Sequence, residues 1–251
     1  MIAANVRVTL EIAANSLASA LASQEGGADR VELCENLGEG GCTPSYGTLA
    51  MARERLRIPL YVLIRPRAGD FLYDTLERET MLRDIAMCAR LGCDGVVIGA
   101  LDADGAVDLT TCRELIEAAG PLGVTFHRAF DVAHDLDDAL EAVIALGCER
   151  VLTSGGRASA PEGVDRLAAL AQRAQGRIGI MAGAGITPDN VAPFVQRSGV
   201  REVHASAKAV RVSRMRHRHD LPGLDGDRLE SDASIVRALR EALEFRHVGP
   251  A

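Results

Sequence analysis

The phrase GGADRVEL at Gly26–Leu33 returns three times along the chain, as LGCDGVVI at Leu91–Ile98, LGCERVLT at Leu146–Thr153 and SGVREVHA at Ser198–Ala205. Each copy has a glycine at the end of a predicted helix, then a short polar turn, then a β-branched run. Glycine at that place is typical of a left-handed helix cap. The copies start 65, 55 and 52 residues apart, about twice the length of one βα unit.

A second kind of strand falls between the copies, as in IPLYVLIRP, PLGVTFHRAF and RIGIMAGAG, and VRVTLEI begins the series. We therefore expect eight strands, near residues 6–12, 29–34, 59–65, 94–99, 122–127, 149–153, 177–182 and 201–205. The segments between them repeat apolar residues at helical spacing. Strict alternation predicts a (β/α)₈ TIM barrel, a single domain over residues 1–251. A doubly wound open sheet is the weaker alternative, because eight units would leave long unprotected edges. An irregular loop is expected near 211–230, before a last helix at 231–245.

Composition narrows the class of protein. The 251 residues include 28 basic and 35 acidic side chains, for a net charge of −7, so nucleic acid is not an expected partner. No signal peptide is visible, and no apolar run is long enough to predict a membrane span. The six cysteines show no CxxC pair or compact framework. They favour a reducing cytoplasm, with most of the thiols packed in the core.

Alternation along the strands divides their side chains between two faces. One parity is apolar and should pack against the helices. The other carries polar groups near the strand ends, which implies a barrel lumen that is polar toward its carboxyl-terminal mouth. A barrel built only for stability fills its interior with branched apolar residues. The inward-facing polar residues are Thr9, Glu11, Arg30, Glu32, Cys34, Arg65, Thr125, His127, Glu202, His204 and Ser206.

Five residues at or after the strand ends are candidates for catalysis. Catalytic groups in this fold lie at the carboxyl ends of the strands, which makes Glu11, Glu32, His127 and His204 candidate acid–base residues. Asp131 follows in the segment HRAFD and is grouped with them as a support. The alternative for the Arg30, Glu32 and Glu202 charges is a structural ion-pair network inside the barrel.

Candidate anion-binding residues come from the loops after the strands. RPRAGDFLYD supplies Arg65 and Arg67, and HRAFD supplies Arg128. The glycine-rich turns TSGG and AGAG supply the backbone N–H groups of Gly155, Gly183 and Gly185, at the place where many barrels bind phosphate. The alternative is a plain capping turn, because Thr187 and Pro188 also look like an N-cap and a first helical residue. The single lysine, Lys208, lies past the eighth strand, which disfavours a Schiff-base mechanism.

Metal binding is a further hypothesis. The carboxylates of Glu11 and Glu32 with the imidazoles of His127 and His204 would form a mixed oxygen and nitrogen set. Cys34 shares the inward parity of Glu32, and Cys42 lies in the next loop. Two thiolates would favour Cu(I).

Taken together, these motifs resemble the CutC copper homeostasis family. The series LEIAANS, GGADRVELCENLGEGGCTPSYG, IRPRAGDFLY, VTFHRAFD, RVLTSGG, MAGAGI and EVHASA matches it in order from about Leu10 to Lys208. The resemblance implies a TIM barrel, a cytoplasmic setting, a homo-oligomer and a role in copper handling through cysteines. The family's strand-end residues map onto Glu11, Arg30, Glu32, Cys34, Arg65, Arg67, Asp70, Phe71, His127, Arg128, Asp131, His204 and Ser206.

The chain also departs from the family pattern. The family's first strand usually reads LEVCVDS, whereas Ala13 and Asn15 stand here in place of the cysteine and the aspartate, and the MPGGG turn is MAGAG. The loss of that cysteine leaves Cys42 as the second sulfur beside Cys34. Two hypotheses follow. One is a copper homeostasis protein that binds copper through Cys34 with help from a histidine or Cys42, and the other is a barrel enzyme acting on a small phosphorylated or carboxylated metabolite.

Overall fold

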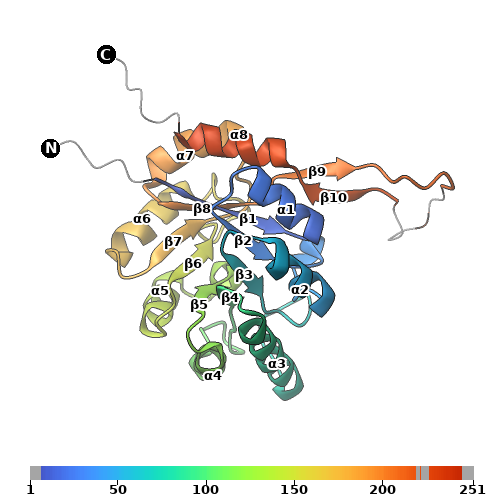
Figure 1. The fold of residues 1–251 in the computed structure, drawn as a ribbon. Coiled ribbons are helices and arrows are strands. Elements are labelled where there is room, and N and C mark those ends of the chain that lie inside the picture. Colours follow the sequence, from blue (N-terminus) through green and yellow to red (C-terminus); the bar gives the residue numbers. More distant parts are fainter. Residues whose placement is uncertain (1–6, 219–220, 222–225, 245–251) are drawn as a thin grey trace, which may run out of the picture.

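The computed structural model describes residues 7–218, 221 and 226–244. Eight parallel strands close into a barrel in sequential order, which confirms the predicted (β/α)₈ TIM barrel. Figure 1 looks into the ring of strands with the helices around it. The strands are β1 Thr9–Ala14, β2 Arg30–Leu33, β3 Leu60–Leu63, β4 Gly95–Ile98, β5 Gly123–Phe126, β6 Arg150–Thr153, β7 Gly179–Ala182 and β8 Glu202–Ala205.

Helices follow the strands on the outside of the barrel. They are α1 Leu17–Glu25, α2 Tyr46–Arg55, α3 Thr75–Leu91, α4 Leu109–Ala119, α5 Leu136–Ala145, α6 Val164–Ala174, α7 Pro188–Ser198 and α8 Ala233–Glu244, with short 3₁₀ turns at Leu37–Glu39 and Arg128–Val132. The predicted left-handed glycines are confirmed, because Gly27, Gly92, Gly147 and Gly199 all have φ between 70° and 91°. Thr187 caps α7 and Pro188 is its first residue, also as predicted.

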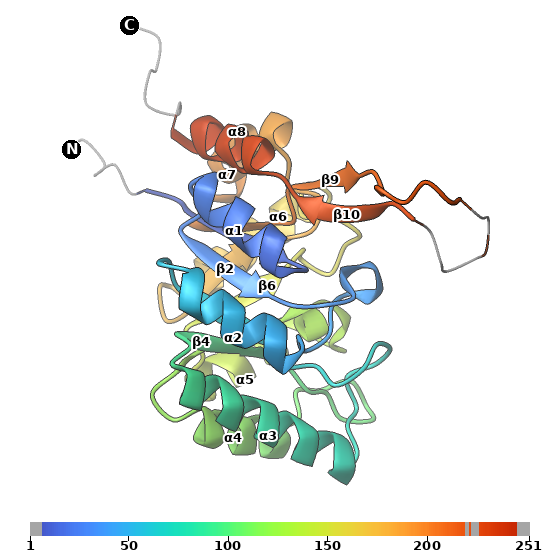
Figure 2. The ribbon, with the colours of Figure 1, turned by 45° about the vertical axis from the view of Figure 1, so that its right-hand side comes forward.

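Several boundaries differ from the sequence prediction. β3 ends at Leu63 rather than at 65, and the last helix begins at Ala233 rather than at 231, because Ser231 pairs in a strand. The first strand was expected at 6–12, but β1 extends to Ala14 because its pairing with β2 continues to the register Ala14↔Leu33; Val6 lies outside the described residues. The irregular loop expected at 211–230 is in part ordered. Its ends pair as an antiparallel hairpin of β9 Lys208–Arg211 and β10 Arg228–Ser231, which projects from the barrel in Figure 2.

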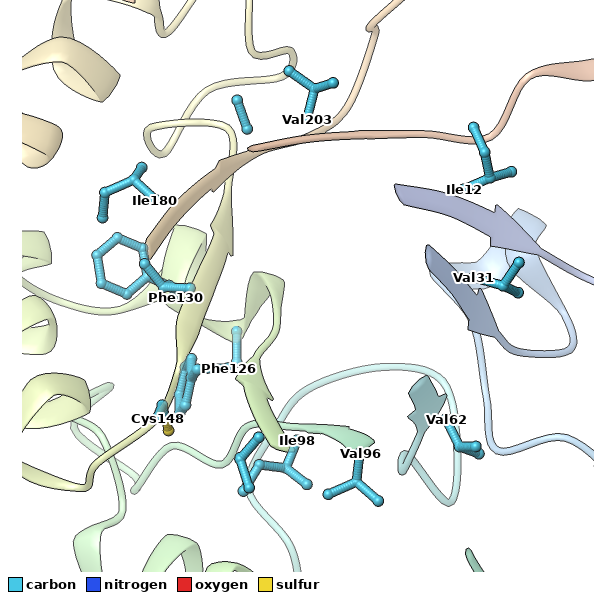
Figure 3. Packing of buried hydrophobic residues seen from close by; sticks show 14 of the residues in the cluster. Ile12, Val31, Val62, Val96, Ile98, Phe126, Phe130, Cys148, Ile180 and Val203 are labelled. Atoms are coloured by element: carbon cyan, nitrogen blue, oxygen red, sulfur yellow. The ribbon is translucent and has the colours of Figure 1, made fainter. Parts of the chain in front are cut away.

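The predicted parity of the strands is confirmed by two separate apolar clusters. Outward side chains such as Ile12, Val62 and Phe126 pack with the helices in one large core, and Figure 3 shows this layer around the strands. The lumen contributes only a small apolar cluster of Cys34, Tyr61, Leu63 and Val97. Polar side chains such as Glu11, Glu32 and His204 share the lumen with this cluster.

Candidate functional site

The amino-terminal part of the lumen is closed by an ion-pair layer. Arg30 donates to Glu202 at 2.7 Å, and Arg150 donates to the same Glu202 oxygen at 3.1 Å. The Tyr61 ring lies 5.2 Å from the Arg30 guanidinium and 5.0 Å from that of Arg150. Gly95 makes room for this ring, because a Cβ there would lie 2.2 Å from it. The contacts of Arg30 and Glu202 therefore fit the structural ion-pair network that was predicted from the sequence as the alternative to a catalytic role.

Above this layer, three side chains form what we call the acid–base cluster: Glu11, Glu32 and His204. The His204 ring has a carboxylate at each nitrogen. Its Nδ1 lies 2.8 Å from Glu11 Oε1, and its Nε2 lies 3.4 Å from Glu32 Oε2. The second oxygen of Glu11 accepts a hydrogen bond from Arg30 Nε. Strand register explains the grouping, because Glu11 is the partner of both Arg30 on β2 and His204 on β8.

The two carboxylates of the cluster have opposite pKa shifts. Burial alone would raise the pKa of Glu11, but the Arg30 charge and the contact with His204 outweigh it and lower that pKa to about 2. Burial raises the pKa of Glu32 to about 7, against the opposing effect of His204, and the Glu11 charge adds to the rise. Burial alone would lower the pKa of His204, but Glu11 and Glu32 raise it above its ordinary value. Carboxylates whose pKa values are separated in this way are typical of acid–base sites.

The same cluster is a possible metal site. One ligand atom each from Glu11, Glu32 and His204 lies within 4.8 Å of the others, and no other group of three such residues occurs in the described part of the chain. Oxygen and imidazole donors suit a divalent ion better than Cu(I). However, Glu11 is already bonded to Arg30, and the guanidinium charge opposes a second cation there.

The two predicted copper ligands lie beside this cluster. Cys34 is buried at the end of β2, and burial together with the Glu32 charge raises the pKa of its thiol. Cys42 is half-buried and pairs through its backbone with Glu35, the residue after Cys34. A thiolate is the form that binds copper, so Cys34 would have to lose its proton on binding the ion.

Arg65 and Arg67 are both occupied by contacts within the protein. Arg65 donates to the carbonyls of Glu39, Gly41 and Gly69 at 2.7–2.9 Å, which ties the loops after β2 and β3 together. Arg67 binds the carboxylates of Glu77 and Asp70 and three backbone carbonyls. The predicted anion clamp is therefore not formed by two free guanidinium groups.

Asp131 organises the loop after β6. Its carboxylate accepts from the hydroxyls of Thr153 and Ser154, from the N–H groups of Ser154 and Gly156, and from Arg128. Arg128 also donates to Ser154 Oγ at 3.0 Å. This set of bonds describes a loop anchor, and it engages the Arg128 guanidinium that was expected to bind an anion.

The three glycines of the predicted phosphate turns are used differently. The Gly155 N–H bonds Thr153 Oγ1 at 2.8 Å, and the Gly183 N–H bonds the Thr153 carbonyl at 3.0 Å. Gly185 has φ of 74°, and its carbonyl accepts from Asn190 in the first turn of α7. The capping-turn alternative accounts for the Gly185 contact, whereas Gly155 and Gly183 bond the end of β6.

Sequence reasoning did not single out Tyr61 or Arg150 as neighbours of the site, and it named Phe71 only through the family resemblance. The alternation that placed Leu60, Val62 and Ile64 on the outer face already placed Tyr61 in the lumen. Arg150 is the first residue of β6, at a position whose side chain faces the lumen. Phe71 gave no periodic signal, because it lies in the loop between β3 and α3.

Two hollows lie near these elements. A recess of about 60 Å³ opens at the mouth, lined by Asn15, Leu37, Gly38, Ser206, Lys208, Leu229 and Ser231. A larger hollow of about 490 Å³ lies on the outer ring, where residues of α2 and α3 line it, and it includes none of the acid–base cluster.

No described helix is long and apolar enough to cross a membrane.

The fold and the cluster define a TIM barrel with a buried acidic and imidazole site in the lumen. The model of the CutC family matches residues 8–209, so the chain belongs to the CutC family. It is 58% identical over 236 residues to a CutC family protein of Xanthomonas axonopodis pv. citri, and 56% identical over 241 residues to one of Chromobacterium violaceum; each match covers 94% of this chain and 98% of the relative.

Solved structures agree with this assignment. A crystal structure of CutC from Streptococcus agalactiae, which its name connects with copper homeostasis, is 34% identical with a TM-score of 0.76, and the match covers 79% of this chain and 98% of that one. Thiamine phosphate pyrophosphorylase from Pyrococcus furiosus matches at 16% identity and a TM-score of 0.60, over 96% of this chain and 98% of that one. The second likeness concerns the fold alone.

Proposed function

We propose that this CutC protein is an enzyme that moves a proton on a small anionic metabolite at the carboxyl-terminal mouth of its barrel. The observation that carries the proposal is the position of His204 between the carboxylates of Glu11 and Glu32. Glu11 is fixed in its ionised form by Arg30. Glu32 has a pKa of about 7, so both of its protonation states are populated near neutral pH, as an acid–base catalyst requires.

The roles follow from the contacts of the cluster. Glu32 takes a proton from the substrate and returns it. His204 faces Glu32 through Nε2 and is oriented through Nδ1 by Glu11, as a buried carboxylate orients an imidazole in other acid–base sites. Among the described residues, the Arg65 guanidinium bonds only backbone carbonyls, so its charge is not compensated by a carboxylate and favours an anionic substrate.

The test is solvent-deuterium exchange. The protein is incubated in D₂O with a panel of small phosphorylated and carboxylated metabolites, and deuterium at carbon is measured by NMR. The proposal expects exchange that Glu32→Gln reduces at least a hundredfold, within the range typical of general-base loss. The matched control is Glu149→Gln, which removes a carboxylate that the Tyr61 hydroxyl contacts at 2.7 Å and should retain exchange. Exchange that persists undiminished in Glu32→Gln contradicts the proposal.

A second candidate function is copper handling, with copper as the cargo. It is supported by the family's connection with copper homeostasis and by the position of Cys34 next to the Glu35–Cys42 bridge. Titration with Cu(I) against a competing chelator tests it. Stoichiometric binding that Cys34→Ala abolishes, and that Cys112→Ala in α4 leaves unchanged, would support this role. Equal affinity in the Cys34→Ala variant would count against it.

We also infer a cytoplasmic location and a homo-oligomeric state. The location is supported by cysteines that are all free in this structure, as expected in a reducing compartment. The oligomeric state is supported by family membership. Light scattering on the eluting protein tests it, and a mass near 26.6 kDa would contradict it.

A further inference from the structure

Three buried side-chain atoms are unusual among the described residues, because they alone have no hydrogen-bond partner. They are Arg65 Nε, Tyr73 Oη and His127 Nε2. Leaving a buried polar group unpaired is unfavourable, so three such groups require an explanation. All three can act as hydrogen-bond donors.

The three residues belong to one region of the mouth, which we call the donor cluster. The Arg65 guanidinium lies 5.1 Å from the centre of the Phe71 ring, and that ring lies 5.0 Å from the ring of His127. Arg65 and Tyr73 lie side by side. Burial raises the pKa of Tyr73 to about 12, while the Arg65 charge and a side-chain contact with Arg65 oppose this rise. Phe71 therefore contacts two of the three members.

The hydrogen bonds of His127 define its protonated nitrogen. The backbone N–H of Ala129 donates to His127 Nδ1 at 3.1 Å, so in the neutral ring the proton is on Nε2. Burial lowers the pKa of His127 to about 3, and the Arg65 charge adds to this effect. Gly99 leaves space for the ring, because a Cβ there would lie 2.5 Å from it. A ring that stays neutral donates a hydrogen bond but does not serve as an acid or a base near neutral pH.

The donor cluster and the acid–base cluster lie on different parts of the barrel wall. His127 follows β5, four strands away from β1 in the closed barrel, and Arg65 follows β3. Glu11, Glu32 and His204 come from β1, β2 and β8. The candidate base and the donors therefore come from different strands of the same barrel.

We propose that the donor cluster binds a carbonyl or carboxylate oxygen of the substrate, while Glu32 removes a proton from the carbon next to that group. This assignment rests on the proposed function and names its substrate class: small carbonyl compounds with an acidic C–H bond. Glu32 takes the proton, the C–H electron pair forms a C=C bond, and the carbonyl π electrons move to the oxygen. His127 Nε2–H and Arg65 stabilise the resulting enolate oxygen. Glu32 then returns the proton to the same carbon as the enolate collapses to the carbonyl, so there is no net redox change.

Access to the donors depends on Phe71. Its side chain is partly buried and packs against the core, and the donor atoms of Arg65 and His127 are covered. In this proposal the Phe71 ring moves aside when the substrate oxygen binds. A trapped water on the same donors is the alternative occupant.

The experiment uses oxalate, a planar dianion that resembles an enolate of a small oxo acid. Calorimetry measures its dissociation constant for the wild type, for His127→Phe, which keeps a ring but removes the donor, and for the matched control His134→Phe, on an exposed loop. We expect binding at millimolar concentration or tighter, at least tenfold weaker in His127→Phe and unchanged in His134→Phe. No binding to the wild type, or equal binding to His127→Phe, overturns the proposal.

A second readout does not depend on a variant that folds. In wild-type protein labelled with [¹⁵N]histidine, we expect the Nε2–H resonance of His127 to shift on addition of oxalate, and an unmoved resonance at saturation would assign the donors to trapped water. Glu32→Gln separates the two proposals. It should abolish deuterium exchange but retain oxalate binding. Exchange that persists in Glu32→Gln defeats the role of Glu32 in both proposals, whereas a wild type that exchanges deuterium but does not bind oxalate defeats the donor cluster alone.

Discussion

Replacing Glu32 by glutamine should change how the stability of the protein depends on pH. The Glu32 carboxyl is buried, and its pKa rises from the ordinary value of 4.5 to about 7 in the folded chain. Between these two values the folded state holds a proton that the unfolded state has lost. Stability therefore falls as pH rises through this window. Glutamine has nearly the same shape but cannot ionise, so it removes this loss.

The magnitude follows from the same pKa. A rise in the pKa of Glu32 from 4.5 to about 7 corresponds to about 3 kcal/mol of unfolding free energy. Each pKa unit is worth about 1.4 kcal/mol. Because Glu32 shares its proton equilibrium with His204 and Glu11, we expect about 1–3 kcal/mol. Relative to the wild type, Glu32→Gln should gain this amount of unfolding free energy between pH 4.5 and pH 8.

The assay is urea denaturation followed by circular dichroism at half-unit steps of pH, with the linear slope checked for each variant. The matched control is Glu241→Gln, an exposed carboxylate on α8, whose profile should run parallel to that of the wild type. A Glu32→Gln profile that also runs parallel to the wild type would refute the reasoning. It would mean that the folded chain accommodates an ionised Glu32 without cost.

Three further variants test the lumen and its loops. Arg30→Met should lower the unfolding free energy by about 3–5 kcal/mol in urea titrations, because it leaves Glu11 buried without its main counter-charge; a loss below about 1 kcal/mol would contradict this. Gly95→Ala should cost more than about 2 kcal/mol in thermal or urea unfolding, since its methyl would overlap the Tyr61 ring, and wild-type stability would show that the ring can move freely. Asp131→Asn should cost about 2 kcal/mol and make the loop after β6 the first site cut in limited proteolysis, whereas an unchanged cleavage pattern would remove the anchoring role.

Much of the fold could be predicted because its signals are local and repeated. A glycine cap followed by a β-branched run marks the turn into a strand, and alternation along the strand assigns each side chain to the lumen or the outer layer. The bounds of strands were predicted less accurately where they depend on which strands pair with each other. The extension of β1 to Ala14 depends on its register with β2, and the β9–β10 hairpin pairs residues some twenty positions apart.

The site shows a similar division. Parity correctly placed Glu11, Glu32 and His204 in the lumen, but only the strand register shows that His204 lies between the two carboxylates. The roles expected for Arg65 and Arg67 were harder to predict, because their partners are backbone carbonyls and carboxylates on loops. Loop conformation is poorly encoded by periodic patterns. The tautomer of His127 depends on one backbone N–H from Ala129, which no pattern of residue types would have indicated.

The most direct test of the account is a titration of the lumen carboxyls themselves. Protein labelled with ¹³C at the glutamate carboxyls is followed by NMR from pH 3 to pH 9, and the Glu32 resonance is assigned from its loss in Glu32→Gln. The account predicts a midpoint for Glu32 near pH 7, well above that of Glu11, which should remain ionised across the range. A Glu32 midpoint near the ordinary 4.5 would contradict the claim that the Glu11–His204–Glu32 cluster is an acid–base site.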